Sequence, residues 1–115
     1  MVDHSYVKGL RVEKPAARLL DLRPCQVGQI RSADELHKLR AGEVLVCPTT
    51  SAAWMMVFRR AGALVTDAGS VLSHTAIVAR EFALPAVVAT ANATSTLLDG
   101  EEVIVDGSRG VVTRC

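Results

Sequence analysis

The sequence predicts a mixed α/β domain with a partly parallel central sheet, flanking helices, and a second small sheet or barrel from the terminal strands. Short apolar runs alternate with amphipathic segments through the middle of the chain, which is typical of parallel strands joined by helices. Glycine-containing strand patterns lie towards both ends of the chain. At 115 residues the chain is long enough for one hydrophobic core and too short to hold a nucleotide-binding domain as well.

The first part of the chain shows little hydrophobic periodicity, and residues 1–20 are predicted to be a leader or linker. The folded domain is predicted to span residues 21–115. Its first strand is expected over residues 24–31. Ser32 then caps a short amphipathic helix that ends near Gly42.

The next elements follow from apolar runs separated by turn residues. Residues 43–47 predict a buried strand, and Pro48 begins a turn into a helix over residues 51–60. The remaining predicted elements are a strand over 63–66, a turn over 69–73, a helix over 74–82, a strand over 86–88, a helix over 92–98, and closing strands over 103–105 and 111–113.

A single histidine, His74, follows the small-residue turn and begins a predicted helix. The first N–H groups of a helix lack intrahelical acceptors and carry partial positive charge, so a phosphate can be held there. The same field disfavours an imidazolium, which leaves a nitrogen lone pair available to attack phosphorus. Gly69 and Ser70 allow a tight turn whose amides face the added oxygens, and Ser73 is a candidate N-cap and hydroxyl donor. Taken alone, Ser73 and His74 also fit a simpler interpretation, a capping serine beside a partly exposed histidine.

Three further side chains near this turn are candidates, and two of them, Asp67 and Arg80, have a second interpretation. Thr66 and Asp67 end the preceding strand and could hydrogen-bond the imidazole or select its tautomer, whereas Asp67 could instead form an Asx-type turn. Arg80 lies about 9 Å along the helix from His74 at 1.5 Å per residue, so it would have to fold back to reach a phosphate there. It could equally pair with Glu81 or with a docking partner.

The segment around His74 resembles the phosphohistidine, or swivelling, domain of the phosphoenolpyruvate (PEP)-utilising enzymes, which include pyruvate phosphate dikinase, phosphoenolpyruvate synthase and rifampicin phosphotransferase. The likeness runs from about Gln26 to Val112. The family pattern is roughly Thr-Asp/Glu-x-Gly-Gly-x-x-Ser-His-x-Ala-Ile-Val-Ala-Arg-Glu, then Gly-Ile-Pro-Ala-Val-Val-Gly, then Gly-x-x-Val-x-Val-Asp-Gly-x-x-Gly-x-Val. The corresponding segments here are Thr66-Asp67-Ala68-Gly69-Ser70, Ser73-His74-Thr75-Ala76-Ile77-Val78-Ala79-Arg80-Glu81, Ala83-Leu84-Pro85-Ala86-Val87-Val88-Ala89 and Gly100–Val112.

The resemblance implies a swivelling β/β/α fold and a phosphoryl-carrier function. His74 would be phosphorylated transiently and would move the group between an ATP site and an acceptor such as pyruvate or PEP. ATP and Mg²⁺ would belong to a nucleotide-binding, ATP-grasp-like partner and the acceptor to a substrate-binding partner, with no metal or cofactor held by this domain. The chain would be a phosphotransferase component that is inactive without its partners. The alternative is a stand-alone regulatory or docking module with the same fold whose His74 is never phosphorylated.

The chain departs from the family pattern at four places. Ser70 replaces a second glycine in the turn, which adds a Cβ and restricts positive φ. Leu72 stands where the dikinases carry a regulatory threonine, which favours the rifampicin phosphotransferase-like branch over a dikinase. Ala83 and Ala89 replace two further glycines, which we interpret as a change of packing without loss of chemistry.

Composition limits the remaining function classes. A net charge of +1 gives no basis for binding nucleic acid or a membrane surface. The three cysteines, Cys25, Cys47 and Cys115, are scattered without metal-ligand spacing, which favours a reduced, cytoplasmic protein, with Cys47 buried. No apolar run approaches the roughly 20 residues of a membrane span, and the N-terminus lacks the apolar region of a signal peptide.

Overall fold

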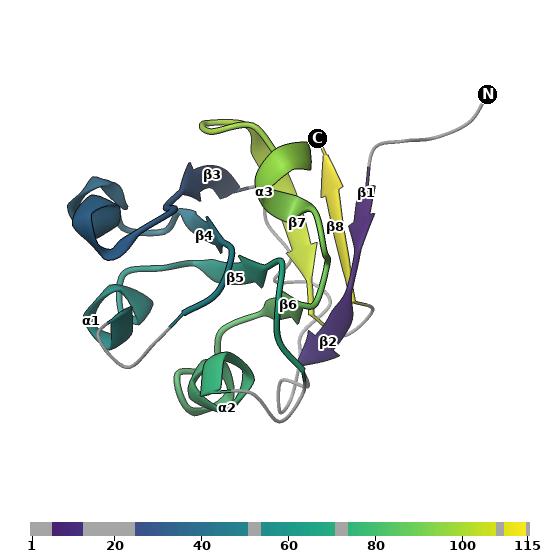
Figure 1. Ribbon diagram of the computed structural model, residues 1–115, viewed down its shortest axis with the longest axis horizontal. Helices are drawn as coiled ribbons and strands as arrows, with labels where there is room; N and C mark the ends of the chain where they lie inside the picture. Colours follow the sequence, from purple (N-terminus) through teal and green to yellow (C-terminus); the bar gives the residue numbers. More distant parts are fainter. Residues whose placement is uncertain (1–5, 13–24, 51–53, 71–73, 108–109, 115) are drawn as a thin grey trace.

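Residues 6–12, 25–50, 54–70, 74–107 and 110–114 are described by the computed structural model, and in them one eight-stranded sheet forms the framework. Its order is β1-β8-β7-β3-β4-β5-β6-β2 (Figure 1). The central strands are parallel: β3 (Cys25–Gln29), β4 (Val44–Cys47), β5 (Ala63–Thr66) and β6 (Ala86–Val88). The outer strands pair antiparallel: β1 (Tyr6–Lys8), β2 (Leu10–Val12), β7 (Glu102–Asp106) and β8 (Val111–Arg114).

The two outermost strands are consecutive in sequence. β1 pairs with β8 at one edge, and β2 pairs with β6 at the other, so the chain around Gly9 bridges the two ends of the strand order. A Cβ on Gly9 would lie 2.5 Å from the carbonyl oxygen of Val88, so the bridge passes close to the backbone of β6. The sheet is therefore nearly closed into a barrel, and the predicted fold class, including its terminal second sheet or barrel, is confirmed.

Both strands β1 and β2 lie in the segment that the sequence analysis assigned to a leader or linker. Each has three residues, too few to produce a readable alternation of apolar and polar side chains. Their hydrogen-bonding partners, β8 and β6, are distant in sequence. The structure thus places residues 6–12 in the sheet, where local sequence patterns predict no strand.

The helical segments are shorter than predicted. They are η2 (Ala33–Lys38, a 3₁₀ helix), α1 (Met55–Phe58), α2 (His74–Glu81) and α3 (Ala93–Thr96). η2 ends before Leu39 although the sequence predicts a helix up to about Gly42. The predicted start of α1 at residues 51–53 lies outside the described residues.

Two apolar clusters fill the space on the two sides of the parallel strands. On one side Leu45 and Cys47 pack with Phe58 of α1 and Ala76 of α2, and on the other Val44 and Val46 pack with residues of α3, β7 and β8. Figure 1 shows α1 and α2 along one side of the parallel strands and α3 on the side of β7 and β8. Because both faces are covered, β4 and β5 are buried over their whole length. Cys47 is fully buried, as predicted.

The α2 helix ends in a Schellman motif with an alanine in the left-handed position. Ala83 has a φ of 55°, its N–H donates to the carbonyl oxygen of Arg80 at 3.1 Å, and the N–H of Leu84 donates to that of Ala79 at 2.9 Å. Ala89 also has a positive φ, 59°. Both alanines therefore occupy a backbone conformation that glycine adopts at lower cost, and Ala89 also packs against the core cluster, so these replacements affect backbone conformation as well as packing.

Candidate functional site

His74 is the first residue of α2, directly after the connection from the carboxyl end of β5. The helix turns Thr75, Ala76, Val78 and Ala79 towards the interior, because these positions share one face. His74 is exposed, as are Ile77 and Glu81 at the i+3 and i+7 positions of the outer face. Its imidazole makes no hydrogen bond or ion pair with any other described residue that would occupy its nitrogens. The predicted placement of His74 at a helix start is found.

The turn before α2 is only partly described. Gly69 has a φ of 123°, a conformation that side chains with a Cβ rarely adopt, and both Gly69 and Ser70 are exposed. Ser73, the predicted cap, lies outside the described residues together with residues 71 and 72.

Thr66 and Asp67 have partners other than those that the sequence suggested. The hydroxyl of Thr66 donates to the carbonyl oxygen of Ala68 at 2.7 Å. Oδ1 of Asp67 accepts the backbone N–H of Thr94 at 2.9 Å, and Oδ2 accepts the Thr94 hydroxyl at 2.5 Å. Neither the imidazole nor an Asx-type turn is involved in these contacts. The carboxylate instead holds the start of α3.

Arg80 lies in the last turn of α2 and is half-buried, remote along the helix axis from His74. The structure therefore does not bring the two side chains together by helix geometry. The first turn of α2 is attached instead to the loop after β4, because the hydroxyls of Thr50 and Thr75 are hydrogen-bonded to each other.

Cys47 lies beneath the turn at the end of β4, and its carbonyl oxygen accepts the N–H of Asp67 at 3.2 Å. Burial, and secondarily the negative charge of Asp67, raises the pKa of Cys47 to about 12. The side chain is therefore a neutral thiol and an inert part of the core at neutral pH. Among the described residues no group of three or more His, Cys, Asp or Glu side chains is arranged to hold a metal ion.

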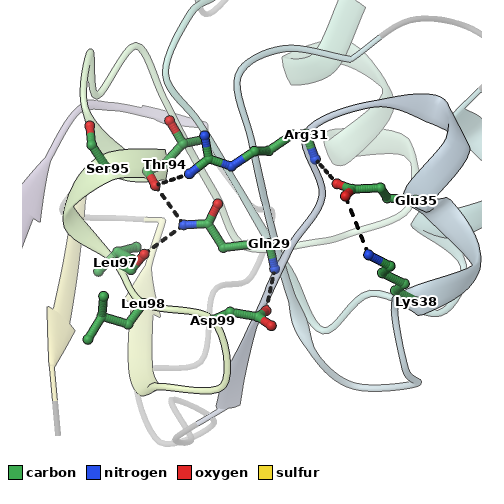
Figure 2. Close-up of a pocket in the computed structure, with 9 residues that line it drawn as sticks. All are labelled: Gln29, Arg31, Glu35, Lys38, Thr94, Ser95, Leu97, Leu98 and Asp99. Atoms are coloured by element: carbon green, nitrogen blue, oxygen red, sulfur yellow. Dashed lines mark hydrogen bonds and ion pairs between the residues drawn. The ribbon is translucent and has the colours of Figure 1, made fainter.

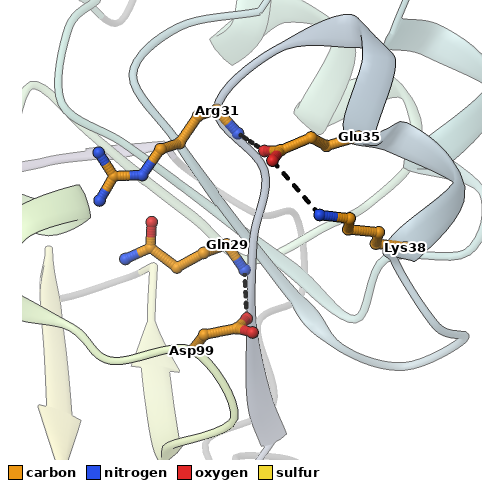
Figure 3. A network of polar contacts seen from close by, with 5 residues as sticks. All are labelled: Gln29, Arg31, Glu35, Lys38 and Asp99. Carbon is orange, nitrogen blue, oxygen red and sulfur yellow. Dashed lines mark hydrogen bonds and ion pairs between the residues drawn. The ribbon is translucent and has the colours of Figure 1, made fainter.

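A polar cleft of about 540 Å³ opens between η2 and α3, at the carboxyl end of β3 (Figure 2). The carboxylates that line this cleft already accept hydrogen bonds from neighbouring residues of the chain. Glu35 accepts the N–H of Arg31 at 2.9 Å and the Lys38 ammonium at 3.4 Å, and Asp99 accepts the N–H of Gln29 at 2.9 Å (Figure 3). The backbone hydrogen bond from Arg31 is the main cause that lowers the pKa of Glu35.

Thr90 and Thr94 are not among the site residues predicted from the sequence, although both contact the end of β5. Thr90 donates through its N–H and its hydroxyl to the carbonyl oxygen of Thr66, each at 3.1 Å, and its hydroxyl accepts the N–H of Ala93 at 3.1 Å. The available signal was a threonine just before a predicted helix, a common capping residue. That signal indicates a helix start but gives no contact with a turn 24 residues earlier.

The chain matches the family model described as "PEP-utilising enzyme, mobile domain" over residues 39–110. It is 48% identical over 84 residues to an uncharacterized phosphotransferase, YvkC, of Bacillus subtilis, a match covering 73% of this chain and 10% of that protein. It is 52% identical over 75 residues to the phosphoenolpyruvate synthase of Aeropyrum pernix, covering 65% of this chain and 9% of that enzyme. The chain thus spans about a tenth of the length of these relatives.

Solved structures agree with the fold. The NMR solution structure of Enzyme I (nEIt) aligns with a TM-score of 0.60 and 34% identity, covering 69% of this chain and 33% of that one. The solution structure of a UPF0107 protein aligns with a TM-score of 0.67 over 96% of this chain and 98% of that one. Its identity is 13%, so it supports the fold alone. Among the described residues, no helix is both long and apolar enough to cross a bilayer.

Proposed function

Because this chain belongs to the PEP-utilising enzyme family as a mobile domain, we propose that it carries a phosphoryl group on His74 between sites on partner domains. The family relationship confirms the predicted resemblance and supports a role in phosphotransfer. Phosphorylation of His74 and movement between partners are our inferences. The observation that carries them is the exposed imidazole at the first position of α2, within the matched segment.

The proposed chemistry needs an accessible nitrogen and a donor. An imidazole lone pair attacks phosphorus, a P–N bond forms, and the bond to the leaving oxygen breaks with its electron pair. In the second step an acceptor oxygen attacks the same phosphorus, and the imidazole leaves with its lone pair restored. Gly69, Ser70 and Ser73 would hold the phosphoryl oxygens through turn amides and hydroxyls. Arg80 remains a candidate for this cradle, whereas the buried hydroxyl of Thr66 is already donated to the carbonyl oxygen of Ala68.

The partners must supply what this domain lacks. We propose a nucleotide-binding, ATP-grasp-like domain with ATP and Mg²⁺ as donor, and a substrate-binding domain for pyruvate, PEP or a similar acceptor. These partners stabilise the transferring charge, so the chain alone is a cytoplasmic phosphotransferase component without turnover. The relatives are about ten times as long as the matched segment, which leaves room for such domains in them.

The test supplies the chain in trans to a partner. The Aeropyrum pernix phosphoenolpyruvate synthase, with the segment that matches this chain removed, is incubated with the chain and either ATP and Mg²⁺ or PEP. The removed segment, added back separately, serves as the positive control. Acid-labile phosphate on His74, detected by mass spectrometry at alkaline pH, supports the proposal.

Two variants define the outcome. His74→Ala should abolish the label, whereas His37→Ala, which removes an exposed imidazole on η2, should leave it unchanged. If the control segment is labelled and this chain is not, the carrier function is wrong and the docking-module alternative replaces it.

A further inference from the structure

Hydrogen bonds continue beyond the paired strands β5 and β6 into the connections that follow them. The N–H groups of Ala91 and Ala89 donate to the carbonyl oxygens of Asp67 and Ala68, at 2.9 and 3.4 Å. Thr90 adds two bonds to the carbonyl oxygen of Thr66. The first residues of the turn that leads to His74 are therefore fastened to the loop that leads to α3.

Asp67 and Thr94 make the strongest part of this connection. One carboxylate accepts both the backbone N–H and the hydroxyl of the same residue, at 2.9 and 2.5 Å. Bonds to an ionised acceptor are about twice as strong as neutral ones, and two donors from one residue determine the direction as well as the distance. These two hydrogen bonds therefore restrict the side chain of Asp67 to one conformation.

Thr94 is itself anchored from the opposite side. Its carbonyl oxygen accepts Nε2 of Gln29 at 2.8 Å and a guanidinium N–H of Arg31 at 3.4 Å, as Figure 2 shows. The same Nε2 donates to the carbonyl oxygen of Leu97 at 2.6 Å, and the N–H of Gln29 is bonded to Asp99 (Figure 3). A polar chain Asp67–Thr94–Gln29 thus joins the end of β5 to the end of β3, across the intervening strand β4.

We infer that Asp67 and Thr94 are positioning residues that fix the first residues of the connection leading from β5 towards His74, an inference that rests on the proposed carrier function. The start of the turn is fixed by Asp67 and the first turn of α2 by the buried Thr75 and Ala76. Between them, Gly69 has a φ of 123°, a backbone conformation that residues with a Cβ rarely adopt. Phosphoryl transfer depends on placement, since a displacement of about 1 Å can cost about a hundredfold in rate.

The test compares the intrinsic reactivity of two histidines in the same 115-residue chain, so it needs no partner protein. Phosphoramidate, a small phosphoryl donor, is attacked at phosphorus by an imidazole nitrogen; a P–N bond to the ring forms, and the original P–N bond breaks with release of ammonia. Peptide mass spectrometry gives the ratio of the initial phosphorylation rates of His74 and His37. His37 is exposed on η2 and lies outside the Asp67–Thr94–Gln29 chain, so it corrects for global effects.

Thr94→Val removes the hydroxyl at nearly constant shape and should lower the ratio about tenfold. Thr94→Ser, which keeps the hydroxyl, should restore it. Thr96→Val makes the same change within α3, where the hydroxyl makes no bond to another described residue, and should leave the ratio unchanged. Asp67→Ala removes the bonds to both the N–H and the hydroxyl of Thr94, so it should lower the ratio at least as far as Thr94→Val. The double variant should fall no further than Asp67→Ala alone.

The inference is overturned if wild-type His74 is no more reactive than His37, if Thr94→Val leaves the ratio intact, or if Thr96→Val lowers it equally. Failure of the carrier function is a separate result: it is read from the enzymatic labelling of the wild-type chain.

Discussion

Replacing Ala83 by glycine should stabilise the protein. Ala83 is exposed and stands in the left-handed position of the Schellman motif that ends α2, with a φ of 55°. For a residue with a Cβ this conformation costs roughly 1–2 kcal/mol. Glycine removes that cost but gains about 0.4–1 kcal/mol of unfolded-state entropy. The difference predicts a net stabilisation of about 0.5–1 kcal/mol for Ala83→Gly.

Urea unfolding followed by circular dichroism measures this difference, with the midpoint expected to rise at constant slope. Thermal unfolding should shift upward by a few degrees, given about 4–8 °C per kcal/mol for domains near this size. Ala41→Gly is the matched control: Ala41 is exposed and has no positive φ, so the same substitution should destabilise by about 0.4–1 kcal/mol. If both variants lose stability alike, the strain argument for the α2 terminus is refuted.

Three further outcomes follow from the structure. Burial and Asp67 raise the pKa of Cys47 from 9.0 to about 12, so the thiol's contribution to stability is complete below about pH 9 and lost as pH rises towards 12. Between about pH 8 and about pH 10.5, the free energy of unfolding in urea should fall by about 2 kcal/mol more for the wild type than for Cys47→Ala. Equal falls would contradict a raised pKa for the Cys47 thiol. Gly62→Ala places a Cβ 2.5 Å from the carbonyl oxygen of Gly42, so it should lower the free energy of unfolding by about 1–3 kcal/mol in thermal unfolding. A free energy of unfolding that does not fall would argue against this close approach. Gly69→Ala forces an unfavourable backbone at a φ of 123° and should slow labelling of His74 by the partner enzyme, and an unchanged rate would show that the turn tolerates other conformations.

Local patterns were sufficient for the parallel half of the sheet. The strands at 63–66 and 86–88 are found at the predicted residues, because a strand covered on both faces is a short apolar run bounded by turn residues. The same patterns place His74 at the start of a helix, since the buried positions of α2 repeat with helical spacing.

Contacts between distant segments could not be read in this way. A sequence shows that Asp67 follows a strand but not which donor meets its carboxylate, and Thr94 lies 27 residues later. β1 and β2 exist because β8 and β6 offer unpaired edges, which only the assembled sheet creates.

The sequence by itself determined the family, the alternation of strands and helices, and the position of the histidine at the head of α2, because each depends on neighbouring residues and a short period. Tertiary structure alone decided the near closure of the sheet, the left-handed alanines, and the attachment of the His74 turn to α3. These depend on hydrogen bonds and backbone angles that form only when remote segments pack together.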